Sequence, residues 1–353
     1  MKKVKIYGAG SIGNHLANAA RTLGMEVVIC DVSPAALERT RTDLYPGRYG
    51  KWDEAIQLCT NDQAPRGGFD LICIGTPPEY HLPLALEALK ENPKALQIEK
   101  PLCEPFAPKL SALQQYAAEK KTPVFIGYDH VIGKSAQRAE ILLKDGAIGE
   151  VITFDAEFRE HWAGIFKAHH WLAGPQDSYL GYWKKGGGAS GEHSHALNIW
   201  QHFSHVLGQG CVQQVFAKLD IVKDGAAEYD RICSMELQTE SGFNGRVIQD
   251  VVTLPSSKRI LFIGTEGKLE WVANYNSKGD ALLIHRPGKE VVIEEIPKTR
   301  PDDFIQELNH IQNCLQTGSE SPISLRRGID TMRALHAAHE SHKTGKTVPV
   351  LYA

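Results

Sequence analysis

The 353-residue chain is short of the features that mark extracellular, metal-bound or nucleic-acid-binding proteins. It has seven cysteines, an odd number, and no two of them have the C-x-x-C spacing. A disulfide framework and a cysteine zinc site are therefore disfavoured, and we expect no metal. Acidic and basic residues nearly balance at a net charge of −3, with no block of one sign. We therefore expect no nucleic-acid partner.

Long apolar runs are also missing, and none approaches the length of a membrane-spanning helix. We expect no membrane partner. The first residues begin a strand pattern at once, which leaves no room for a signal peptide and indicates a cytoplasmic protein. The length predicts two domains, and no internal repeat is evident.

The most informative stretch is the first thirty-one residues. Val4–Tyr7 is a short apolar strand pattern, the glycine-rich turn Gly8–Gly13 follows, and a helical pattern begins directly after it. Gly8 would permit the tight turn, Gly10 would let a pyrophosphate approach the backbone, and Gly13 would let helix and strand pack closely. The helix N-terminus would attract the phosphates. This context predicts a dinucleotide site that includes Gly8, Gly10, Ser11, Ile12 and Gly13.

The second strand pattern, Glu26–Cys30, ends on Asp31. A carboxylate at this position accepts hydrogen bonds from the adenosine ribose hydroxyls and repels a 2′-phosphate, so we expect NAD rather than NADP. Arg39 and Arg41, further along, keep NADP as the alternative.

The rest of the N-terminal third alternates strand and helix patterns. Strands are expected at 69–74, 95–98 and 123–127. This alternation predicts an α/β Rossmann domain over residues 1–127, with a doubly wound parallel sheet. From residue 128 strand patterns follow one another, which predicts an α+β domain over 128–353 with a large, mostly antiparallel open sheet. Two helices are expected at 303–314 and 325–342, and either could pack back on the first domain.

The ends of the parallel strands should carry the ligand site. Thr76 and Pro77 follow one expected strand, and Glu99-Lys100-Pro101 follows the next. A lysine at such a strand end could exchange a proton with a substrate hydroxyl or carbonyl oxygen. Alone, it would equally fit a surface lysine paired with Glu99.

A second candidate lies in the glycine-rich segment 186–191 and the helix expected to start near Ser190. Spacings of three residues would place Glu192, His195 and Asn198 on one face of that helix, where they could orient a polar substrate and exchange its proton. Seven of the fifteen histidines fall between 161 and 205, interleaved with aromatic residues. Such a mixture suits a polyol pocket. A zinc site using His169 and His170, or His193 and His195, is the alternative.

Taken in order, these motifs resemble the Gfo/Idh/MocA family, which includes glucose–fructose oxidoreductase and inositol dehydrogenase. The glycine turn matches the family's nucleotide turn, residues 76–81 match its T-P-x-x-x-H segment beside the cofactor, and residues 99–101 match its E-K-P motif. The resemblance implies that Lys100 is catalytic and that Thr76, Pro77, His81 and Glu99 lie at the cofactor. It also implies a homo-oligomer, either a homodimer or a homotetramer.

The chain departs from the family in its substrate region. Asn198 stands where the family has an Asp, and Glu192 could replace a second Asp only with a one-residue shift. Tyr128-Asp129-His130 replaces the family's Phe-Asn-Arg. We therefore expect an NAD-dependent oxidoreductase acting on a hydroxyl or ketone of a sugar, inositol or sugar derivative. Two alternatives stay open: a redox-neutral lyase, glycosidase or epimerase with tightly bound NAD, and a non-catalytic dinucleotide or sugar sensor.

Overall fold

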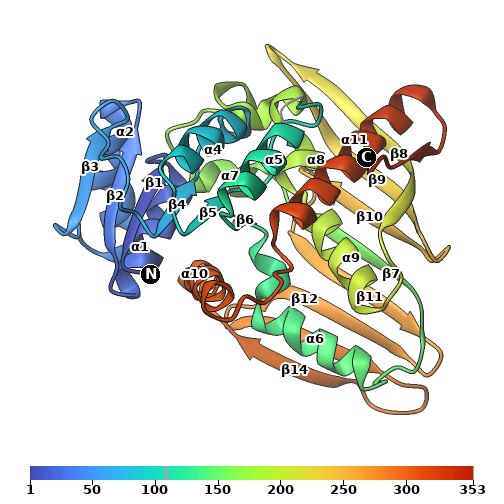
Figure 1. The fold of residues 1–353 in the computed structure, drawn as a ribbon. Helices are drawn as coiled ribbons and strands as arrows, with labels where there is room; N and C mark the ends of the chain where they lie inside the picture. Colours follow the sequence, from blue (N-terminus) through green and yellow to red (C-terminus); the bar gives the residue numbers. More distant parts are fainter. Residues whose placement is uncertain (108–109, 353) are drawn as a thin grey trace. The chain divides into compact units, whose positions relative to one another are not determined.

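The computed structural model describes residues 1–107 and 110–352, which form two compact units (Figure 1). Unit 1 contains Met1–Cys103, Ala107–Asp129 and Arg300–Gly328. Unit 2 contains Glu104–Phe106, His130–Thr299 and Ile329–Ala353. Each unit has its own sheet. Within the described residues, no helix is both long and apolar enough to cross a membrane.

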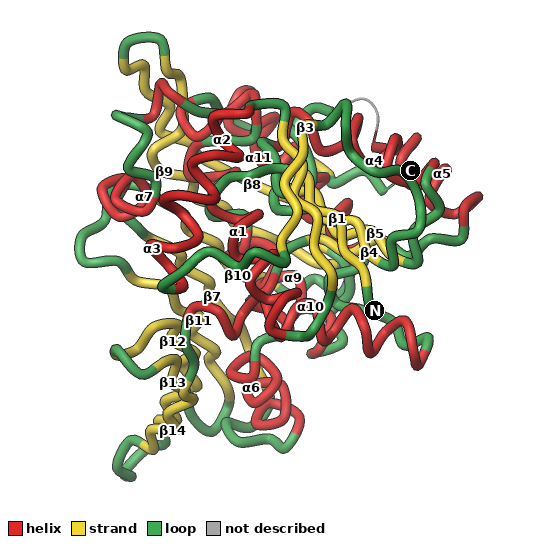
Figure 2. Tube along the Cα trace, turned by 90° about the vertical axis from the view of Figure 1, so that its left-hand side faces the viewer, coloured by secondary structure: helices red, strands yellow, loops and turns green. Residues whose placement is uncertain are grey.

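Unit 1 is built on a six-stranded parallel sheet in the order β3-β2-β1-β4-β5-β6. Its strands are β1 (Lys3–Tyr7), β2 (Glu26–Asp31), β3 (Ile56–Thr60), β4 (Leu71–Ile74), β5 (Ala95–Ile98) and β6 (Val124–Ile126). Figure 2 shows these strands as yellow tubes lying side by side. The strands β4, β5 and β6 are buried along their whole length, as expected when helices cover both faces of a parallel sheet. The predicted doubly wound sheet is confirmed.

The helices of unit 1 alternate with its strands. They are α1 (Ser11–Thr22), α2 (Pro34–Arg39), α3 (Tyr45–Tyr49), α4 (His81–Lys90) and α5 (Leu110–Lys120). The helix α2 ends at Arg39, and the chain continues directly into a π-helical turn, Thr40–Leu44. The strand order reverses direction between β1 and β4, and such a switch point is where open α/β sheets bind ligands.

A late segment of the chain completes unit 1. The helix α10 (Arg300–Thr317) lies on α1, where the ring of Phe304 stacks on His15 with centroids 4.8 Å apart. The amino group of Met1 donates to Gln312 at 2.9 Å. Of the two C-terminal helices, α10 is therefore part of unit 1.

Unit 2 is built on a nine-stranded sheet in the order β14-β13-β12-β11-β7-β10-β9-β8-β15. Its strands are β7 (Val151–Arg159), β8 (Val212–Asp224), β9 (Ala227–Thr239), β10 (Asn244–Asp250), β11 (Ser257–Gly264), β12 (Lys268–Asn276), β13 (Gly279–His285), β14 (Val292–Pro297) and β15 (Val348–Pro349). Only β7 and β10 pair in parallel among these described strands. The large, mostly antiparallel sheet expected from the sequence is therefore confirmed.

Burial alternates along these strands because one face carries helices. The helix α6 (Lys134–Lys144) packs on β12 and β13, and α9 (His195–Val206) packs on β7 and β10 (Figure 1). On the other face, Phe216 of β8 lies between the buried Val215 and Ala217 and is 40% exposed. The sheet is thus open on one side.

Candidate functional site

The three glycines of the turn at the end of β1 differ in what surrounds them. Gly8 has φ +106°, and an added Cβ would lie 2.7 Å from the carbonyl oxygen of Gly75. At Gly13 an added Cβ would lie 1.9 Å from the carbonyl oxygen of Gly8. These two glycines are therefore required by the packing of the turn itself. Gly10 differs, because an added Cβ would have no atom within 4 Å. The open space at Gly10 is what a close-lying ligand would need.

The start of α1 is free of competing acid. Its N-cap residue, Gly10, offers no side-chain cap, and its first turn has no acidic side chain. The helix N-terminus can therefore serve an anionic ligand. Arg48 donates to the carbonyl oxygen and to the hydroxyl of Ser11, both at 2.8 Å. Sequence reasoning missed this arginine, because its only signal is a basic residue far along the chain.

Asp31 lies at the end of β2 and contacts the same turn. One carboxylate oxygen accepts from the backbone N–H of Ala9 at 2.7 Å, and the other accepts from Ser33 at 2.8 Å. A carboxylate has about four lone-pair sites, so both oxygens can still accept from ribose hydroxyls. Asp31 thus orders the loop as well as offering the predicted acceptor.

The third contribution comes from the end of β4. The hydroxyl of Thr76 is buried and has no hydrogen-bond partner among the described residues. A buried polar atom of this kind usually has a partner, which a bound ligand or water could supply. With the open space at Gly10 and the uncapped start of α1, the residues of unit 1 fit a dinucleotide.

His81 links the two sequence motifs, and its place at the cofactor stays a prediction. It is fully buried; its Nε2 lies 2.7 Å from the carbonyl oxygen of Thr76, and its Nδ1 lies 3.0 Å from that of Pro101. Burial lowers the pKa of His81 to about 4, although the two carbonyl oxygens oppose this shift. A neutral imidazole has one N–H and can donate to only one of these carbonyls. His81 therefore fixes the loop after β4 against the loop after β5.

Lys100 follows β5 and is half-buried, and the Lys100–Pro101 peptide bond is cis. Its neighbour Glu99 turns inward: the side chain accepts from the amide of Gln97 at 3.0 Å and is only 6% exposed. Burial raises the pKa of Glu99 to about 7. Lys100 thus lies at the strand end as predicted, and the cofactor contact of Glu99 stays a prediction.

In unit 2 the glycine-rich segment packs on its own chain. An added Cβ at Gly187 would lie 2.1 Å from the carbonyl oxygen of Tyr179, and one at Gly191 would lie 2.0 Å from that of Gly186. Gly188 has φ +73° and faces the carboxyl of Asp230 on β9, 2.0 Å from an added Cβ. These glycines therefore serve a close turn against a strand.

Asp230 is the buried partner of this turn. Its carboxyl accepts from the backbone N–H of Ser190 at 2.7 Å and from the Ser190 hydroxyl at 3.0 Å. The residue is fully buried, and burial raises its pKa to about 7. The hydroxyl of Ser190 also lies 3.3 Å from Nε2 of His339, a ring that stacks on Trp183. Asp230 could not be recognised from the sequence, because one acidic residue in a strand pattern has no distinguishing spacing.

The prediction that one helix carries Glu192, His195 and Asn198 is wrong. The chain forms α8 (Gly188–Glu192), turns at 193–194, and begins α9 at His195. Glu192 is therefore on a different helix, where it accepts from the hydroxyl of Tyr179 at 3.4 Å. The helix α8 thus has only five residues and ends before His193.

His195 and Asn198 share α9 but have different surroundings. Asn198 is 3% exposed, and its amide donates to the hydroxyl of Thr331 on α11 (Leu325–Thr344) at 3.0 Å. His195 is half-buried and packs edge-on against His130, with ring centroids 4.7 Å apart. The ring of His130 is in turn held by Phe158 and Trp271, at 5.2 and 5.9 Å.

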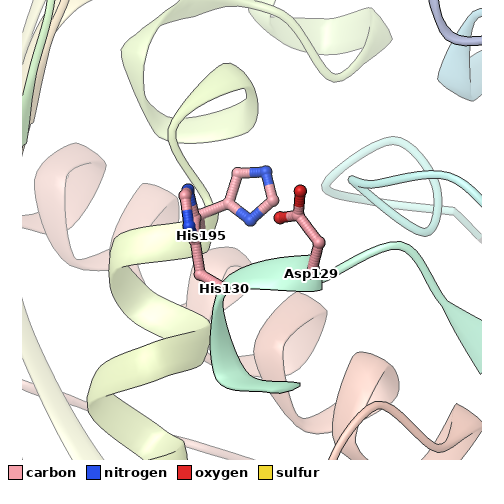
Figure 3. Close-up of side chains that lie close together, drawn as sticks. All are labelled: Asp129, His130 and His195. Atoms are coloured by element: carbon pink, nitrogen blue, oxygen red, sulfur yellow. The ribbon is translucent and has the colours of Figure 1, made fainter. Parts of the chain in front are cut away.

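Figure 3 shows His130 and His195 with Asp129, which directly precedes His130 in the short helix Asp129–Ile132. Each of the three offers one potential ligand atom, and these atoms lie within 4.8 Å of one another. The departure from the family pattern at residues 128–130 thus places its histidine beside His195. All three side chains are only half-buried, and two imidazoles beside a carboxylate are groups that can exchange protons.

The remaining histidines and aromatics of segment 159–208 are largely used by the fold. Trp162, Tyr179 and Ala189 belong to one hydrophobic cluster of unit 2. Nδ1 of His169 lies 2.7 Å from the carbonyl oxygen of Ile165. Among the described residues, His169 and His170 belong to no group of three potential metal ligands; a second such group is His205, Cys211 and Asp330. The expected lining of a polyol pocket by this segment stays a prediction.

Two family models match the chain. Residues 2–128 match the oxidoreductase family with an NAD-binding Rossmann fold, and residues 136–270 match the GFO/IDH/MocA C-terminal domain. No curated protein sequence matches.

Solved structures are similar over almost the whole chain. A levoglucosan dehydrogenase in complex with NADH shares 18% identity over 100% of both chains, with a TM-score of 0.79. An aldose–aldose oxidoreductase from Caulobacter crescentus, complexed with glycerol, shares 19% over 99% of both chains, with a TM-score of 0.77. A putative myo-inositol dehydrogenase from Sinorhizobium meliloti 1021 shares 21% over 99% of this chain and 100% of its own, with a TM-score of 0.74. At these identities the likeness establishes the fold.

Proposed function

This chain belongs to the GFO/IDH/MocA family of NAD-binding oxidoreductases, and from that premise we propose that it is an NAD-dependent dehydrogenase of sugars, inositols or their derivatives. The observation that carries the proposal is Lys100, half-buried at the end of β5, on the same sheet edge as the open glycine turn. The solved relatives are described with levoglucosan, glycerol or inositol chemistry, which supports a polyhydroxylated substrate.

Each residue has one task in this proposal. NAD, when bound, supplies the hydride acceptor at a carbinol carbon. The start of α1 and the turn at Gly10 hold the pyrophosphate, and Asp31 holds the adenosine ribose. Lys100 takes the proton of the reacting hydroxyl, and His195 is the second proton-transfer group, with His130 holding its ring.

Asp31 also supports NAD as the preferred cofactor. Its carboxylate would face the ribose 2′ position, where a phosphate would bring like charges together. The next residue, Val32, is 79% exposed and carries no charge that could offset this repulsion.

A redox-neutral reaction with retained NAD is the second candidate. The adjacent rings of His130 and His195 favour it, because an elimination or epimerisation needs proton transfers in addition to those of a simple dehydrogenase. Substrate consumed without accumulation of NADH would identify this reaction.

The deciding experiment is a screen of sugars, inositols and sugar nucleotides with NAD, following NADH and substrate separately. With the best substrate, Lys100→Met should lower kcat by about 10²–10⁴-fold while the Kd for NAD changes little. Lys94→Met is the matched control, because Lys94 is 71% exposed and pairs with Asp70 on the surface. A Lys100→Met enzyme that turns over at the wild-type rate would overturn the proposal.

A further inference from the structure

Unit 1 contains two buried carboxyl groups that accept hydrogen bonds from one side-chain amide. The side-chain nitrogen of Gln97 donates to Glu99 at 3.0 Å and to Glu307 of α10 at 3.2 Å. The exposed fractions of Gln97, Glu99 and Glu307 are 0%, 6% and 1%. Gln97 in β5, Glu99 directly after that strand and Glu307, 210 positions away from Gln97, thus form one buried polar group.

The fold makes room for this group. An added Cβ at Gly127, at the end of β6, would lie 2.7 Å from a carboxylate oxygen of Glu99. Only a glycine lets the Glu99 carboxyl occupy this position. The second oxygen of Glu307 and the oxygen of Gln97 are both buried with no hydrogen-bond partner among the described residues. Both atoms are acceptors when Glu307 is ionised, so a donor is missing from the group.

The charges around the group cannot support two carboxylates. The charge of Asp129 acts on both carboxyls, the charge of Asp303 acts on Glu307, and both carboxyls act on the thiol of Cys73. Lys100 is the cation that acts on Glu99, and the backbone N–H of Lys100 donates to Glu99 at 3.3 Å. An unpaired carboxylate inside a protein is costly, whereas a protonated one is neutral and adds an O–H donor.

We propose that Glu307 is a positioning residue that keeps a proton, so that the buried pair carries at most one negative charge, on Glu99, beside Lys100. The mechanistic consequence rests on the proposed function, in which Lys100 moves the substrate proton. The proton on Glu307 supplies the missing donor and lets Glu99 alone respond to pH.

The direction of the pKa shifts agrees with this division. Burial raises the pKa of Glu99 to about 7, and burial together with the charge of Glu99 raises the pKa of Glu307 well above its usual range. As pH rises through about 7, Glu99 loses its proton while Glu307 keeps its own. The charge beside Lys100 therefore changes in the neutral range, and the kcat/KM profile of the enzyme should show a limb near pH 7.

The location of the proton can be measured without substrate. Infrared difference spectra of the wild type against Glu307→Gln at pH 8 should show the carbonyl band of a protonated carboxyl that disappears in the variant and shifts in D₂O. Glu99→Gln should keep this band and lose the one that titrates near pH 7. Glu119→Gln, on the surface of α5, is the control and should leave both bands unchanged. A wild type without either band would overturn the proposal, and this result needs no variant.

Activity separates the positioning role from a merely structural one. Glu307→Gln replaces a neutral group with a neutral group, so its kcat/KM profile should keep the limb near pH 7. Glu99→Gln should abolish that limb. A uniform loss of rate at every pH in both variants would contradict the role beside Lys100. If the bands appear as expected but Lys100→Met stays active, the proposed function fails while the protonated pair stands.

Discussion

The nucleotide turn gives the sharpest prediction, because two of its glycines differ only in what surrounds them. Gly10 has φ −85°, which any residue can adopt, and an added Cβ there meets no atom within 4 Å. Gly10→Ala should therefore leave the free energy of unfolding unchanged or raise it by about 0.4–1 kcal/mol. The new methyl group would instead occupy the space that we assign to the pyrophosphate.

The effect of Gly10→Ala on binding can be estimated from the contacts it removes. A hydrogen bond to a charged group contributes about 1.5–3 kcal/mol. Losing one such contact to a phosphate should raise the Kd for NAD by about 10- to 150-fold. Calorimetric titration measures this Kd directly. In parallel, NAD at a hundredfold excess over the wild-type Kd should stabilise the wild type by about 2.7 kcal/mol and the variant by much less.

Gly13→Ala is the matched control with the opposite expectation. Its Cβ would lie 1.9 Å from the carbonyl oxygen of Gly8, so the backbone must move. We expect a loss of about 1–3 kcal/mol or more in the free energy of unfolding without any ligand, seen as a lower Tm. A Gly10→Ala protein that binds NAD as tightly as the wild type would refute the reasoning, since the open space would then not be the phosphate site.

Three further predictions concern other parts of the molecule. Asp31→Ala should raise the Kd for NAD and bring the Kd values for NAD and NADP closer together, because the ribose acceptor and the repulsion of a 2′-phosphate are lost together. Titration with both cofactors measures the two Kd values, and an unchanged ratio between them would contradict the prediction. Burial raises the pKa of Asp230 from 3.8 to about 7, so the folded state binds a proton that the unfolded state has released, and stability from this group falls as pH rises from about 4 to 7. The side chain of Asp230→Asn cannot titrate, so the difference in the free energy of unfolding between the wild type and this variant, measured in urea, should be smaller at pH 8 than at pH 5. An equal difference at both pH values would count against the assignment. The open face of the second sheet, where Phe216 is exposed, should be covered in a homo-oligomer, and light scattering that gives a monomer at micromolar concentration would rule this out.

The N-terminal unit could be predicted from the sequence because its signals are local. The strand, the turn and the helix of the nucleotide motif are consecutive, and β4 is a continuous apolar run. The strand β3 was missed for a physical reason. It lies at the edge of its sheet, is only partly buried, and its residues Ile56–Thr60 show no clear apolar alternation.

Edge strands are hard to recognise in unit 2 for the same reason. The strand β14 lies at one edge of the second sheet, and four of its six residues are exposed. Its partner β13 begins at Gly279, and glycine is more typical of a turn than of a strand. Interior strands such as β7 and β9 alternate clearly because only one face is buried.

The contacts that build the site are harder to predict, because they join residues far apart in sequence. An amphipathic helix such as α10 shows which of its faces is buried but not which unit buries it, and Glu307 is a glutamate like many others until Gln97 lies next to it. Asp230 is likewise ordinary in sequence and becomes distinctive only against Gly188.

Glycine illustrates why a motif alone cannot separate binding from packing. The run at 186–188 and the turn at 8–13 are both glycine-rich, and both suggested close approach of a ligand. In the first, chain atoms fill the Cβ positions of Gly187 and Gly188, so the glycines are explained without any ligand. At Gly10 no chain atom does so. Gly10 faces empty space beside an uncapped helix start, so the packing of the chain does not explain why this position is a glycine, and it is the position where we expect a ligand.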